Sequence, residues 1–463
     1  MEADVAIIGA GPVGLLLAGL LGRAGHTVAV LERRPGPYAM PRAIHFDGEA
    51  MRCFQAAELA RAILPHTHVG RGMLFKDRDG NTIVDWSRNR TPGFTGWHES
   101  YRFFQPGLEL ELRGALDRLK GTRLVWDAEV TGVSQDRSGV VLRLADGGAV
   151  TARFAVACDG AGSFTRRALG IGLEDLGFRE RWLVCDLLLK RNRDDLGDHS
   201  VQYCDPETPA TYVRGTGDWR RWEIRIRDGD PDAWPESMVW ESLARWITPS
   251  QATLKRSAVY VFRSRIALKW RTGRILLAGD AAHQMPPFMG QGMCAGIRDA
   301  GNLWWKLSAV LRGVGDGLLD TYRSERERNV RAFIEKSVAL GRLINQTGAE
   351  MVPKGRMESI WPDLGPGLGP RDGVGGTLAP QVRTEDGGLA DDAAGHGFYV
   401  LVARDPPESR LPVFTGADRW LEERGVTGVV IRPDGYALGG FRGADELRDL
   451  ERIAMRYGTR GQH

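Results

Sequence analysis

Two glycine-rich segments carry the residues with the clearest chemistry. The first, Gly9-Ala10-Gly11-Pro12-Val13-Gly14, follows the apolar run 5–8. Glycines at this spacing let the chain turn from a strand into a helix and let its backbone approach a pyrophosphate at the positive helix N-terminus. Glu32 lies 18 residues beyond Gly14, at the end of a second apolar run, where a carboxylate accepts hydrogen bonds from ribose hydroxyls. The pattern predicts a dinucleotide site that disfavours a 2′-phosphate.

The second segment begins at Gly279 and has the same character. Gly279-Asp280-Ala281-Ala282-His283 follows the apolar run 275–278 and continues through Pro287 to Gly290-Gln291-Gly292. Between the two segments, Asp159-Gly160 follows another apolar run and opens a further strand-to-helix turn. Three such turns indicate one protein wrapped around one long dinucleotide, and we expect that dinucleotide to be FAD.

Composition sets the wider limits. The chain has 463 residues, 42% of them hydrophobic, so it can bury a substantial core and form two or three domains. A net charge of +3 gives no support for a nucleic-acid partner. The five cysteines form neither a Cys-x-x-Cys pair nor a metal-ligand cluster, which argues against a dithiol flavin reductase, a disulfide framework and a metal site. We find no signal peptide and no apolar run of membrane-spanning length, and expect a cytoplasmic protein.

The elements around these motifs indicate an α/β fold in which a Rossmann-like FAD-binding domain is interrupted by a substrate domain. Residues 13–23 have the apolar spacing of a helix, and residues 27–31 read as a strand. Short alternating segments predict a mostly antiparallel β-sheet for the substrate domain. The predicted FAD-binding domain covers residues 1–70, 101–179 and 271–345, with helices over 107–119 and 321–343, and the predicted substrate domain covers residues 71–100 and 180–270.

Residues 346–463 are predicted to form a linker and a small C-terminal α/β module. Glycine and proline are dense between residues 352 and 388, which indicates a linker or long loop. The module contains no cysteine, so thiol redox chemistry is excluded there. Its expected strands cover 398–402 and 428–431, and its expected helices cover 417–424 and 444–457.

These motifs resemble those of the single-component FAD-dependent aromatic hydroxylases, which have the fold of p-hydroxybenzoate hydroxylase. The similarity covers residues 3–345 and is closest to the 3-(3-hydroxyphenyl)propionate hydroxylases. The C-terminal module resembles a short form of the thioredoxin-like appendage of related phenol hydroxylases, and we expect a structural or intersubunit role for it. The matching stretches include Gly9-x-Gly11-x-x-Gly14 with Glu32, Asp159-Gly160-x-x-Ser163-x-x-Arg166, Gly279-Asp280-Ala281-Ala282-His283, Pro41-Arg42-Ala43-Ile44, Phe104-Gln105-Pro106 and Arg298-Asp299-Ala300-x-Asn302.

The resemblance implies which residues hold the cofactors. Arg42, Gln105 and Asp280 match family contacts to the FAD pyrophosphate and ribityl chain. The backbone of residues 290–293 is expected at a helix N-terminus near the flavin pyrimidine ring. Asp159-Gly160 in this family serves both FAD and the transient reductant, NADH or NADPH. The predicted FAD contacts are Gly9, Gly11, Pro12, Val13, Gly14, Glu32, Arg33, Arg42, Gln105, Asp159, Gly160, Gly279, Asp280, Pro287, Gly290, Gln291, Gly292 and Met293.

The resemblance also implies a reaction in which a flavin C4a-hydroperoxide delivers oxygen to an electron-rich aromatic ring. A phenol reacts faster as its phenolate, so the site needs a proton acceptor and a dry enclosure. His45 is the candidate catalytic base, because its ordinary pKa suits the task and it follows the Arg42 loop. His98 and Tyr203 are weaker candidates, and ordered water with tyrosines would make a dedicated base unnecessary.

Several other polar and aromatic residues have two interpretations. For His283 we favour packing or hydrogen bonding over catalysis. Arg166 and Arg167 fit either phosphate contacts or an exposed helix face. The alternating residues Arg221, Arg225 and Arg227 fit a substrate carboxylate site, although a solvated sheet face is favoured. An aromatic substrate region is expected to include Trp86, Trp97, Trp219, Trp222 and Trp234.

Three functions follow as hypotheses. The leading one is NAD(P)H-dependent hydroxylation of a phenolic acid or related phenol, with a small aromatic substrate and O2 as partners. The second keeps this monooxygenase chemistry and assigns it to a polyketide or another secondary metabolite. The third is an FAD-binding oxidase, reductase or electron carrier. The Trp-x-Trp-x-Ile-Pro signature of flavin halogenases is absent from the sequence. A second copy of the chain, forming a homodimer, is a further possible partner.

Overall fold

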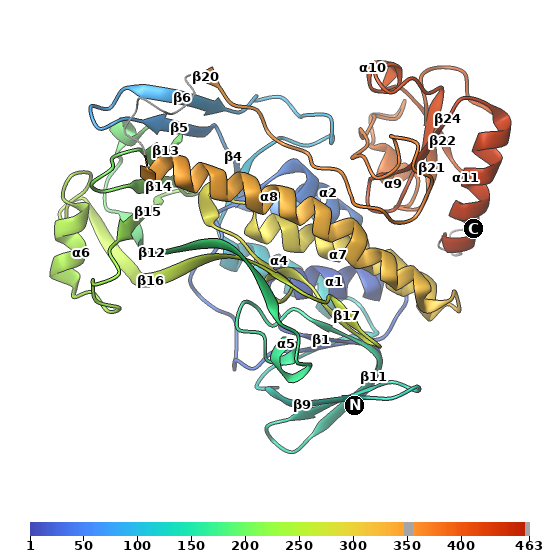
Figure 1. The fold of residues 1–463 in the computed structure, drawn as a ribbon, viewed down its shortest axis with the longest axis horizontal. Coiled ribbons are helices and arrows are strands. Elements are labelled where there is room, and N and C mark those ends of the chain that lie inside the picture. Colours follow the sequence, from blue (N-terminus) through green and yellow to red (C-terminus); the bar gives the residue numbers. More distant parts are fainter. Residues whose placement is uncertain (347–354, 459–463) are drawn as a thin grey trace.

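The computed structural model describes residues 1–346 and 355–458. Its two large sheets are joined by the long helices α7 (Gly292–Leu311) and α8 (Asp320–Gln346). Figure 1 shows the nine-stranded sheet around the left end of α8 and the C-terminal module at the upper right. The interleaved α/β arrangement that the sequence predicts is therefore present.

The eight-stranded sheet forms the core of the FAD-binding domain. Its central strands β1, β2 and β11 pair in parallel and consist of apolar runs buried on both faces. Helix α1 (Pro12–Arg23) follows β1 and packs against α7 and α4 (Gln105–Asp117). The strand order is β17 (Arg271–Thr272), β18 (Ile275–Leu277), β11 (Ala149–Ala157), β1 (Glu2–Ile8), β2 (Val28–Leu31) and β8 (Thr122–Val125), with β10 (Val140–Leu144) and β9 (Val130–Gln135) extending from β11.

The nine-stranded sheet is the predicted substrate domain. Two long antiparallel strands, β12 and β16, form its spine, and helix α6 (Glu236–Leu243) covers its outer face. The strand order is β19 (His283–Gln284), β16 (Ala252–Ala267), β12 (Leu173–Leu189), β15 (Trp219–Ile226), β14 (Ala210–Arg214), β13 (Ser200–Tyr203), β5 (Gly72–Lys76), β6 (Thr82–Ser87) and β20 (Gly355–Arg356).

A small sheet connects the two domains and carries His45. In it β3 (His45–Phe46) pairs with β7 (Tyr101–Phe103), which also pairs with β4 (Thr67–Val69). Helix α2 (Gly48–Ala56) follows β3 directly and is capped by Asp47, whose side chain accepts a hydrogen bond from the backbone N–H of Ala50. Short helix α3 (Ala60–Ile63) follows α2, whereas short helix α5 (Phe164–Ala168) follows β11 and packs against β9.

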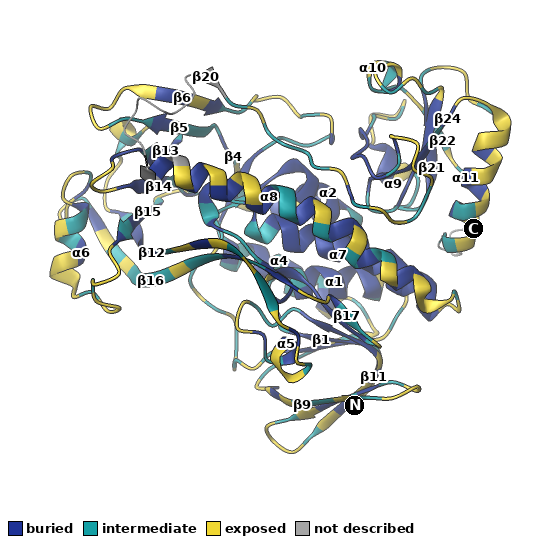
Figure 2. Cartoon of the chain, in the orientation of Figure 1, coloured by how far each residue is buried: buried dark blue, intermediate teal, exposed yellow. Residues whose placement is uncertain are grey.

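Figure 2 shows how burial differs among the helices. Helix α7 is buried almost throughout, whereas α8 and α11 (Ala444–Tyr457) each have one buried and one exposed face. The C-terminal module packs α11 on a four-stranded sheet with the order β22 (Val413–Thr415), β21 (Tyr399–Val402), β23 (Gly428–Ile431) and β24 (Ala437–Phe441), and also contains α9 (Ala390–Ala393) and α10 (Asp418–Glu422).

Some boundaries differ from the sequence prediction. The predicted domain boundary at residue 180 falls inside β12, because this strand runs across both domains. Helix α4 begins at Gln105 rather than at residue 107, with Pro106 in its first turn, where the missing N–H costs nothing. Strands β22 and β24 and helix α6 were not predicted. Residues 352–354 of the predicted linker lie outside the described residues.

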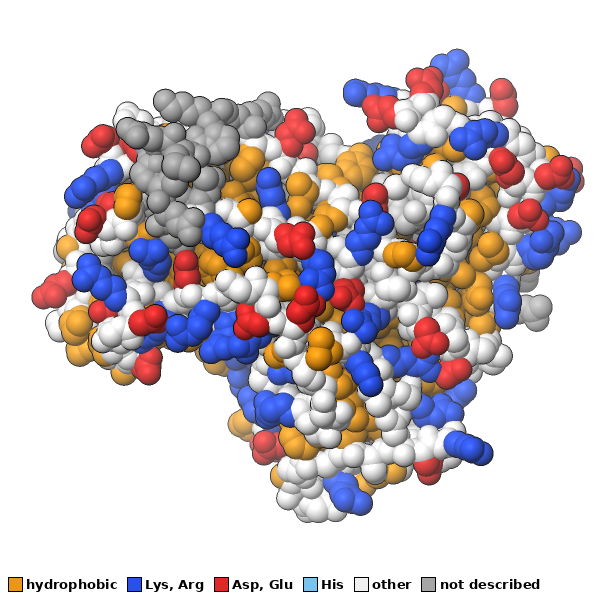
Figure 3. Space-filling view, in the orientation of Figure 1, with side chains coloured by type: hydrophobic (Ala, Val, Ile, Leu, Met, Phe, Trp, Pro, Cys, Tyr) orange, Lys and Arg blue, Asp and Glu red, His pale blue; other side chains and the backbone are white. Residues whose placement is uncertain are grey.

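The surface adds two observations. On the face in Figure 3, acidic and basic side chains are interspersed, so no field of one sign covers it. Among the described residues, no helix is long and apolar enough to cross a membrane, and no group of three metal-ligating side chains occurs.

Candidate active site

The turn between β1 and α1 requires glycine at two of its three motif positions. A Cβ atom at Gly9, where φ is +106°, would lie 2.5 Å from the Cys158 carbonyl oxygen, and one at Gly14 would lie 2.1 Å from the Gly9 carbonyl oxygen. Gly11 is different, because no atom of the described residues lies within 4 Å of its Cβ position. Gly11 is also the N-cap of α1 and offers no side chain to cap it. The helix therefore presents free N–H groups to open space, as an anion site does.

Glu32 is tied to this turn. One carboxylate oxygen accepts a hydrogen bond from the backbone N–H of Ala10 at 2.9 Å, and the other accepts from the backbone N–H of Arg34 at 3.1 Å. The end of β2 is thereby fixed beside the glycine turn. The neighbouring Arg33 is exposed.

Asp159-Gly160 offers a polar atom without a partner. Oδ2 of Asp159 accepts a hydrogen bond from the backbone N–H of Thr165 at 3.0 Å, whereas Oδ1 is buried and has no partner among the described residues. Gly160 has a φ of +80° and open space at its Cβ position. Because a buried carboxylate oxygen is rarely left unsatisfied, the turn is shaped for a ligand that donates to Asp159.

The two glycine-rich segments meet at Val13. A Cβ atom at Gly296 on α7 would lie 2.6 Å from Val13, and Gly279, at a φ of +61°, lies against the same side chain. Asp280 follows with an exposed side chain. The start of α1 and the start of α7 are therefore in close contact, although about 280 residues separate them in sequence.

The start of α7 is a second uncapped helix N-terminus. A short helical turn over Pro287–Met289 leads to Gly290, which adopts the left-handed conformation with a φ of +64°. Gln291 is the N-cap of α7 but makes no capping bond to the helix. Its side-chain oxygen instead accepts a hydrogen bond from Nη1 of Arg298 at 3.0 Å. The N–H groups of Gly292 and Met293 are thus left for a ligand.

Gln105 holds the loop that carries Arg42. Its side-chain oxygen accepts hydrogen bonds from the backbone N–H groups of Arg42 at 2.9 Å and Ala43 at 2.8 Å. The Arg42 side chain is exposed and its guanidinium lies 4.8 Å from the centre of the Tyr38 ring. In this structure Gln105 acts on the loop, and the Arg42 guanidinium faces outward.

His45 lies against the turn at the start of α7. Its Nδ1 atom is 3.3 Å from the Gly290 carbonyl oxygen. Since a carbonyl only accepts, Nδ1 carries the hydrogen and Nε2 has the free lone pair. Burial lowers the pKa of His45, Asp47 opposes this, and the Arg88 and Arg102 charges add to the lowering. His45 is therefore neutral near pH 7 and able to accept a proton at Nε2.

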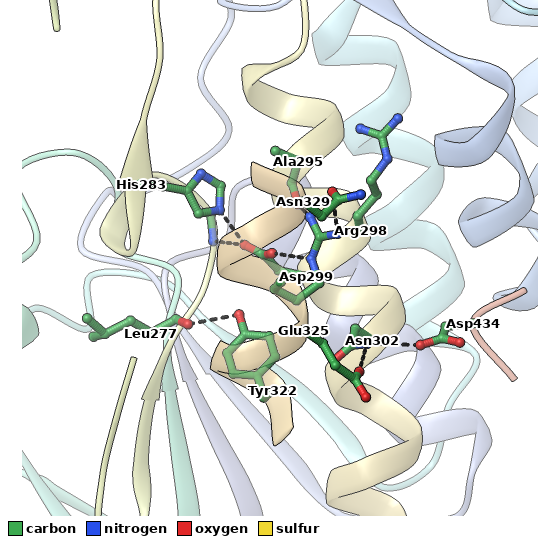
Figure 4. Close-up of polar contacts among 12 residues, drawn as sticks. Leu277, His283, Ala295, Arg298, Asp299, Asn302, Tyr322, Glu325, Asn329 and Asp434 are labelled. Carbon is green, nitrogen blue, oxygen red and sulfur yellow. Dashed lines mark hydrogen bonds and ion pairs between the residues drawn. The ribbon is translucent and has the colours of Figure 1, made fainter. Parts of the chain in front are cut away.

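Three other expectations can be compared with the structure. His283 is buried and its Nε2 lies 2.6 Å from Oδ2 of Asp299, as Figure 4 shows, so the hydrogen-bonding interpretation is confirmed. Arg166 is buried and donates to the carbonyls of Ala281 and Ala161 at 2.9 and 3.0 Å, so the exposed helix face holds only for Arg167. The solvated face expected at Arg221 is wrong, because Arg221 is buried.

The expected aromatic substrate region is also wrong. Trp222 belongs to the core between the nine-stranded sheet and α6. Trp97 donates to the side chain of Gln55, and Trp234 donates to a backbone carbonyl at an exposed turn. Only Trp219, which stacks on Phe104, lies near the start of α4. Trp219 and Trp222 lie three residues apart in β15, so strand alternation sends their rings to opposite faces, and Trp86 is buried in β6.

One residue that the sequence analysis missed is Glu223. It is buried, lies between Arg221 and Arg225 on the same side of β15, and has Arg221 3.8 Å away as its ion-pair partner. The alternation that identified the three arginines also placed Glu223 on their face.

The donor set fits FAD. The site combines the uncapped N-termini of α1 and α7 with the fixed carboxylate of Glu32. It also has an unsatisfied carboxylate oxygen at Asp159 and open space at Gly11 and Gly160. Anions bind at such helix ends, and ribose hydroxyls donate to such carboxylates.

Comparisons with known proteins agree with this geometry. Residues 2–337 match the family model described as "FAD binding domain". The chain is 38% identical to the probable NADH-specific resorcinol 4-hydroxylase of Rhodococcus jostii (strain RHA1), covering 96% of this chain and 93% of that protein. It is 35% identical to the 3-(3-hydroxy-phenyl)propionate/3-hydroxycinnamic acid hydroxylase of Mycolicibacterium smegmatis (strain ATCC 700084 / mc(2)155), covering 93% and 82%.

Solved structures share the fold. The flavin-dependent monooxygenase PieE in complex with FAD and substrate aligns with a TM-score of 0.82 at 20% identity, covering 98% of this chain and 99% of that one. Aklavinone-11 hydroxylase with FAD and aklavinone aligns with a TM-score of 0.77 at 24% identity, covering 98% of each. Because the family model spans most of the chain and close relatives align over most of their length, this protein belongs to the FAD-dependent aromatic hydroxylases that carry this FAD-binding domain.

Proposed function

We propose that the protein hydroxylates an uncharged phenol, a dihydroxybenzene such as resorcinol, with FAD as bound cofactor and NADH as reductant. The observation that carries the substrate class is Glu223, a buried carboxyl group on the side of the nine-stranded sheet that meets the Arg42 loop. The name of the resorcinol hydroxylase relative, which is given as NADH-specific, supports both the substrate and the reductant.

The direction of Glu223 follows from strand alternation. Its neighbours Trp222 and Ile224 pack with α6 in the outer core, so Arg221, Glu223 and Arg225 lie on the inner side. On that side Arg221 donates to the carbonyls of Pro41 and Arg42 at 2.8 and 2.7 Å. Glu223 therefore faces the loop that precedes His45.

The charges around Glu223 favour a neutral substrate. Arg221 and Arg256 are both bound to Asp186, through bonds of 2.8 Å from each Nε atom, so neither is free for a substrate carboxylate. Burial raises the pKa of Glu223, and Asp186 adds to this while Arg221 opposes it. A phenolic hydroxyl can hydrogen-bond to this carboxyl group, whereas a second buried carboxylate would be repelled.

The cofactor would be held at both ends. We infer that the free N–H groups at the start of α1 bind the pyrophosphate, that Glu32 binds the ribose, and that the turn over residues 290–293 contacts the flavin ring. When bound, FAD supplies electron transfer from NADH and the activation of O2. Nε2 of His45 would accept the phenol proton, and its Nδ1–H would remain on the Gly290 carbonyl.

Arg225 favours a second candidate, a phenol that carries a carboxylate. Its side chain is half-buried on the inner side of β15, and no hydrogen bond or ion pair of its guanidinium occurs among the described residues. A phenylpropionate, the substrate class in the name of the second relative, would place its carboxylate there.

Substrate kinetics with two variants separate these candidates. The FAD-loaded protein is assayed with NADH for hydroxylated product and hydrogen peroxide, using resorcinol and 3-(3-hydroxyphenyl)propionate. We expect kcat/KM to be higher for resorcinol and to fall about tenfold or more in Glu223→Gln, the loss typical of a hydrogen bond to a charged or buried group. Arg225→Ala should leave it unchanged. Preference for the phenylpropionate, lost in Arg225→Ala and kept in Glu223→Gln, would establish the second candidate instead.

A further inference from the structure

The C-terminal module inserts polar side chains into the FAD-binding domain. Arg432 donates to Glu325 of α8 at 3.0 and 2.8 Å, and Asp434 accepts from Asn302 of α7 at 3.0 Å (Figure 4). A cleft of about 1800 Å³ opens beside this contact, between the module and the end of α1. The docking combines these buried polar contacts with apolar packing, such as Phe398 against Trp305 of α7.

Tyr436 is the member of this group that approaches the flavin site. It is only 3% exposed, and its hydroxyl donates to Oε1 of Glu49 on α2 at 2.6 Å. Burial, together with the Glu49 carboxylate, raises the pKa of Tyr436 well above its usual range, so the hydroxyl keeps its proton. The hydrogen bond thus supplies a neutral donor to a buried carboxylate.

From Glu49 the contacts continue to the turn at the start of α7. Nε of Arg298 donates to Oε2 of Glu49 at 2.6 Å, and Nη2 of Arg298 donates to Asp47 at 2.5 Å. The remaining nitrogen, Nη1, donates to the side-chain oxygen of Gln291 at 3.0 Å. All three donor groups of this buried guanidinium are in use, so its position is determined jointly by Glu49, Asp47 and Gln291.

A second branch connects the same tyrosine to the Gly279 motif. The Tyr436 hydroxyl accepts a long contact of 3.5 Å from Asn329, and Asn329 accepts from Arg326 at 2.7 Å. Arg326 binds Asp299, and the other oxygen of Asp299 accepts from the Gly279 backbone N–H and contacts His283 (Figure 4).

We propose that the C-terminal module is a positioning element of the flavin site, and that Tyr436 acts through Glu49 and Arg298 on the turn at Gln291. The inference rests on the proposed binding of FAD at that turn. Without the tyrosine hydroxyl, Oε1 of Glu49 loses its donor, Arg298 is drawn toward Glu49, and the hydrogen bond to Gln291 weakens. The Glu49 carboxylate, no longer partly neutralised by this donor, also exerts a stronger negative potential next to the uncapped end of α7, which disfavours a reduced flavin that carries negative charge.

The test is Tyr436→Phe in the full-length protein, with Tyr399→Phe as the matched control. Tyr399 is also a buried tyrosine of the module, and its hydroxyl binds Asp391 of the module and Arg52 of α2. Among the described residues, no side-chain hydrogen bond connects Arg52 or Asp391 to Glu49, Arg298 or Gln291. Each variant removes a buried hydroxyl that has two partners, so their effects on thermal stability should be similar. Glu49→Gln interrupts the proposed path from the FAD-binding side and keeps the result interpretable if Tyr436→Phe fails to fold.

Three measurements are independent of turnover. We expect Tyr436→Phe and Glu49→Gln to weaken FAD binding about three- to tenfold and to increase amide hydrogen exchange over residues 287–296 in the apoprotein. The midpoint reduction potential of bound FAD should fall in Tyr436→Phe and rise in Glu49→Gln, because the glutamine removes a negative charge beside the start of α7. Tyr399→Phe should change none of these. Equal shifts in all three variants, or no shift in Tyr436→Phe, would overturn the positioning role. If the wild-type protein binds no FAD, the proposed function fails instead.

Discussion

Replacing His45 tests whether the phenol proton leaves through this side chain, and the structure supplies two complementary variants. His45→Asn places an amide N–H where Nδ1 lies, so the bond to the Gly290 carbonyl can be kept while Nε2 is removed. His45→Gln places its amide near the position of Nε2 and gives up the bond to Gly290. The asparagine variant therefore isolates the loss of the proton acceptor, and the glutamine variant adds the loss of support for the turn.

The expected magnitude is that of losing a positioned general base. Flavin reduction by NADH and FAD affinity should stay nearly normal in His45→Asn, because the Gly290 contact is retained. The hydroxylation step should slow by about 10²- to 10⁴-fold. In the wild type, burial keeps the pKa of His45 below its ordinary value, so the neutral acceptor predominates at pH 7 and above and coupling should be flat there. In the variant, coupling should rise with pH, because solvent then supplies more phenolate.

The assay is the ratio of hydrogen peroxide released to NADH consumed, measured from pH 6 to pH 9 together with the hydroxylated product. Peroxide should increase in His45→Asn and decrease again toward pH 9. Full coupling of His45→Asn at every pH would refute the reasoning, and the proton would then leave through water or a tyrosine. If only His45→Gln is uncoupled, the role of His45 is to support the Gly290 turn.

Two further predictions concern the cofactor and the acid stability. In Glu32→Ala the FAD affinity should fall at least tenfold, since charge-assisted hydrogen bonds contribute about 1.5–3 kcal/mol each; equilibrium dialysis checks this, and unchanged affinity contradicts the ribose assignment. Burial would raise the pKa of Asp47 and of Asp299. Arg298 nevertheless holds the pKa of Asp47 below its ordinary value, and His283 and Arg326 do the same for Asp299. The stabilisation of the folded protein by ionised Asp47 and Asp299 is present above about pH 4 and is lost as pH falls through their lowered folded-state pKa values. The thermal unfolding midpoint should therefore decrease below about pH 4. A midpoint that stays constant from about pH 7 to pH 3 would contradict this.

The glycine motifs were predictable because their constraints are local. Gly14 is required by the Gly9 carbonyl oxygen within the same turn, and the helix that follows is determined by its apolar spacing, although the close contact at Gly9 comes from Cys158 just after β11. The helix at residues 444–457 was predicted to the residue for the same reason. The position of Glu32 at the end of β2 follows from the standard length of a strand–helix–strand unit.

The parts that sequence reasoning missed depend on contacts between distant segments. Arg221 looked like one of several solvated arginines, because nothing near it in sequence shows that Asp186 and the Pro41 and Arg42 carbonyls would surround it. Tyr436 is 387 residues from Glu49, so no local pattern links them. Such pairs are determined only when whole domains pack.

These distant contacts hold two loops in place. The Arg42 loop lies beside the proposed cofactor site and is held by Gln105 from α4 and by Arg221 from the substrate sheet. The turn before α7 is held by Arg298, which depends in turn on Glu49 and Tyr436. Both loops that would contact the flavin are therefore fixed from outside the glycine motifs. A change in the substrate sheet or in the C-terminal module should consequently alter the flavin environment without touching a predicted FAD contact, and the Tyr436→Phe and Tyr399→Phe pair measures that coupling directly.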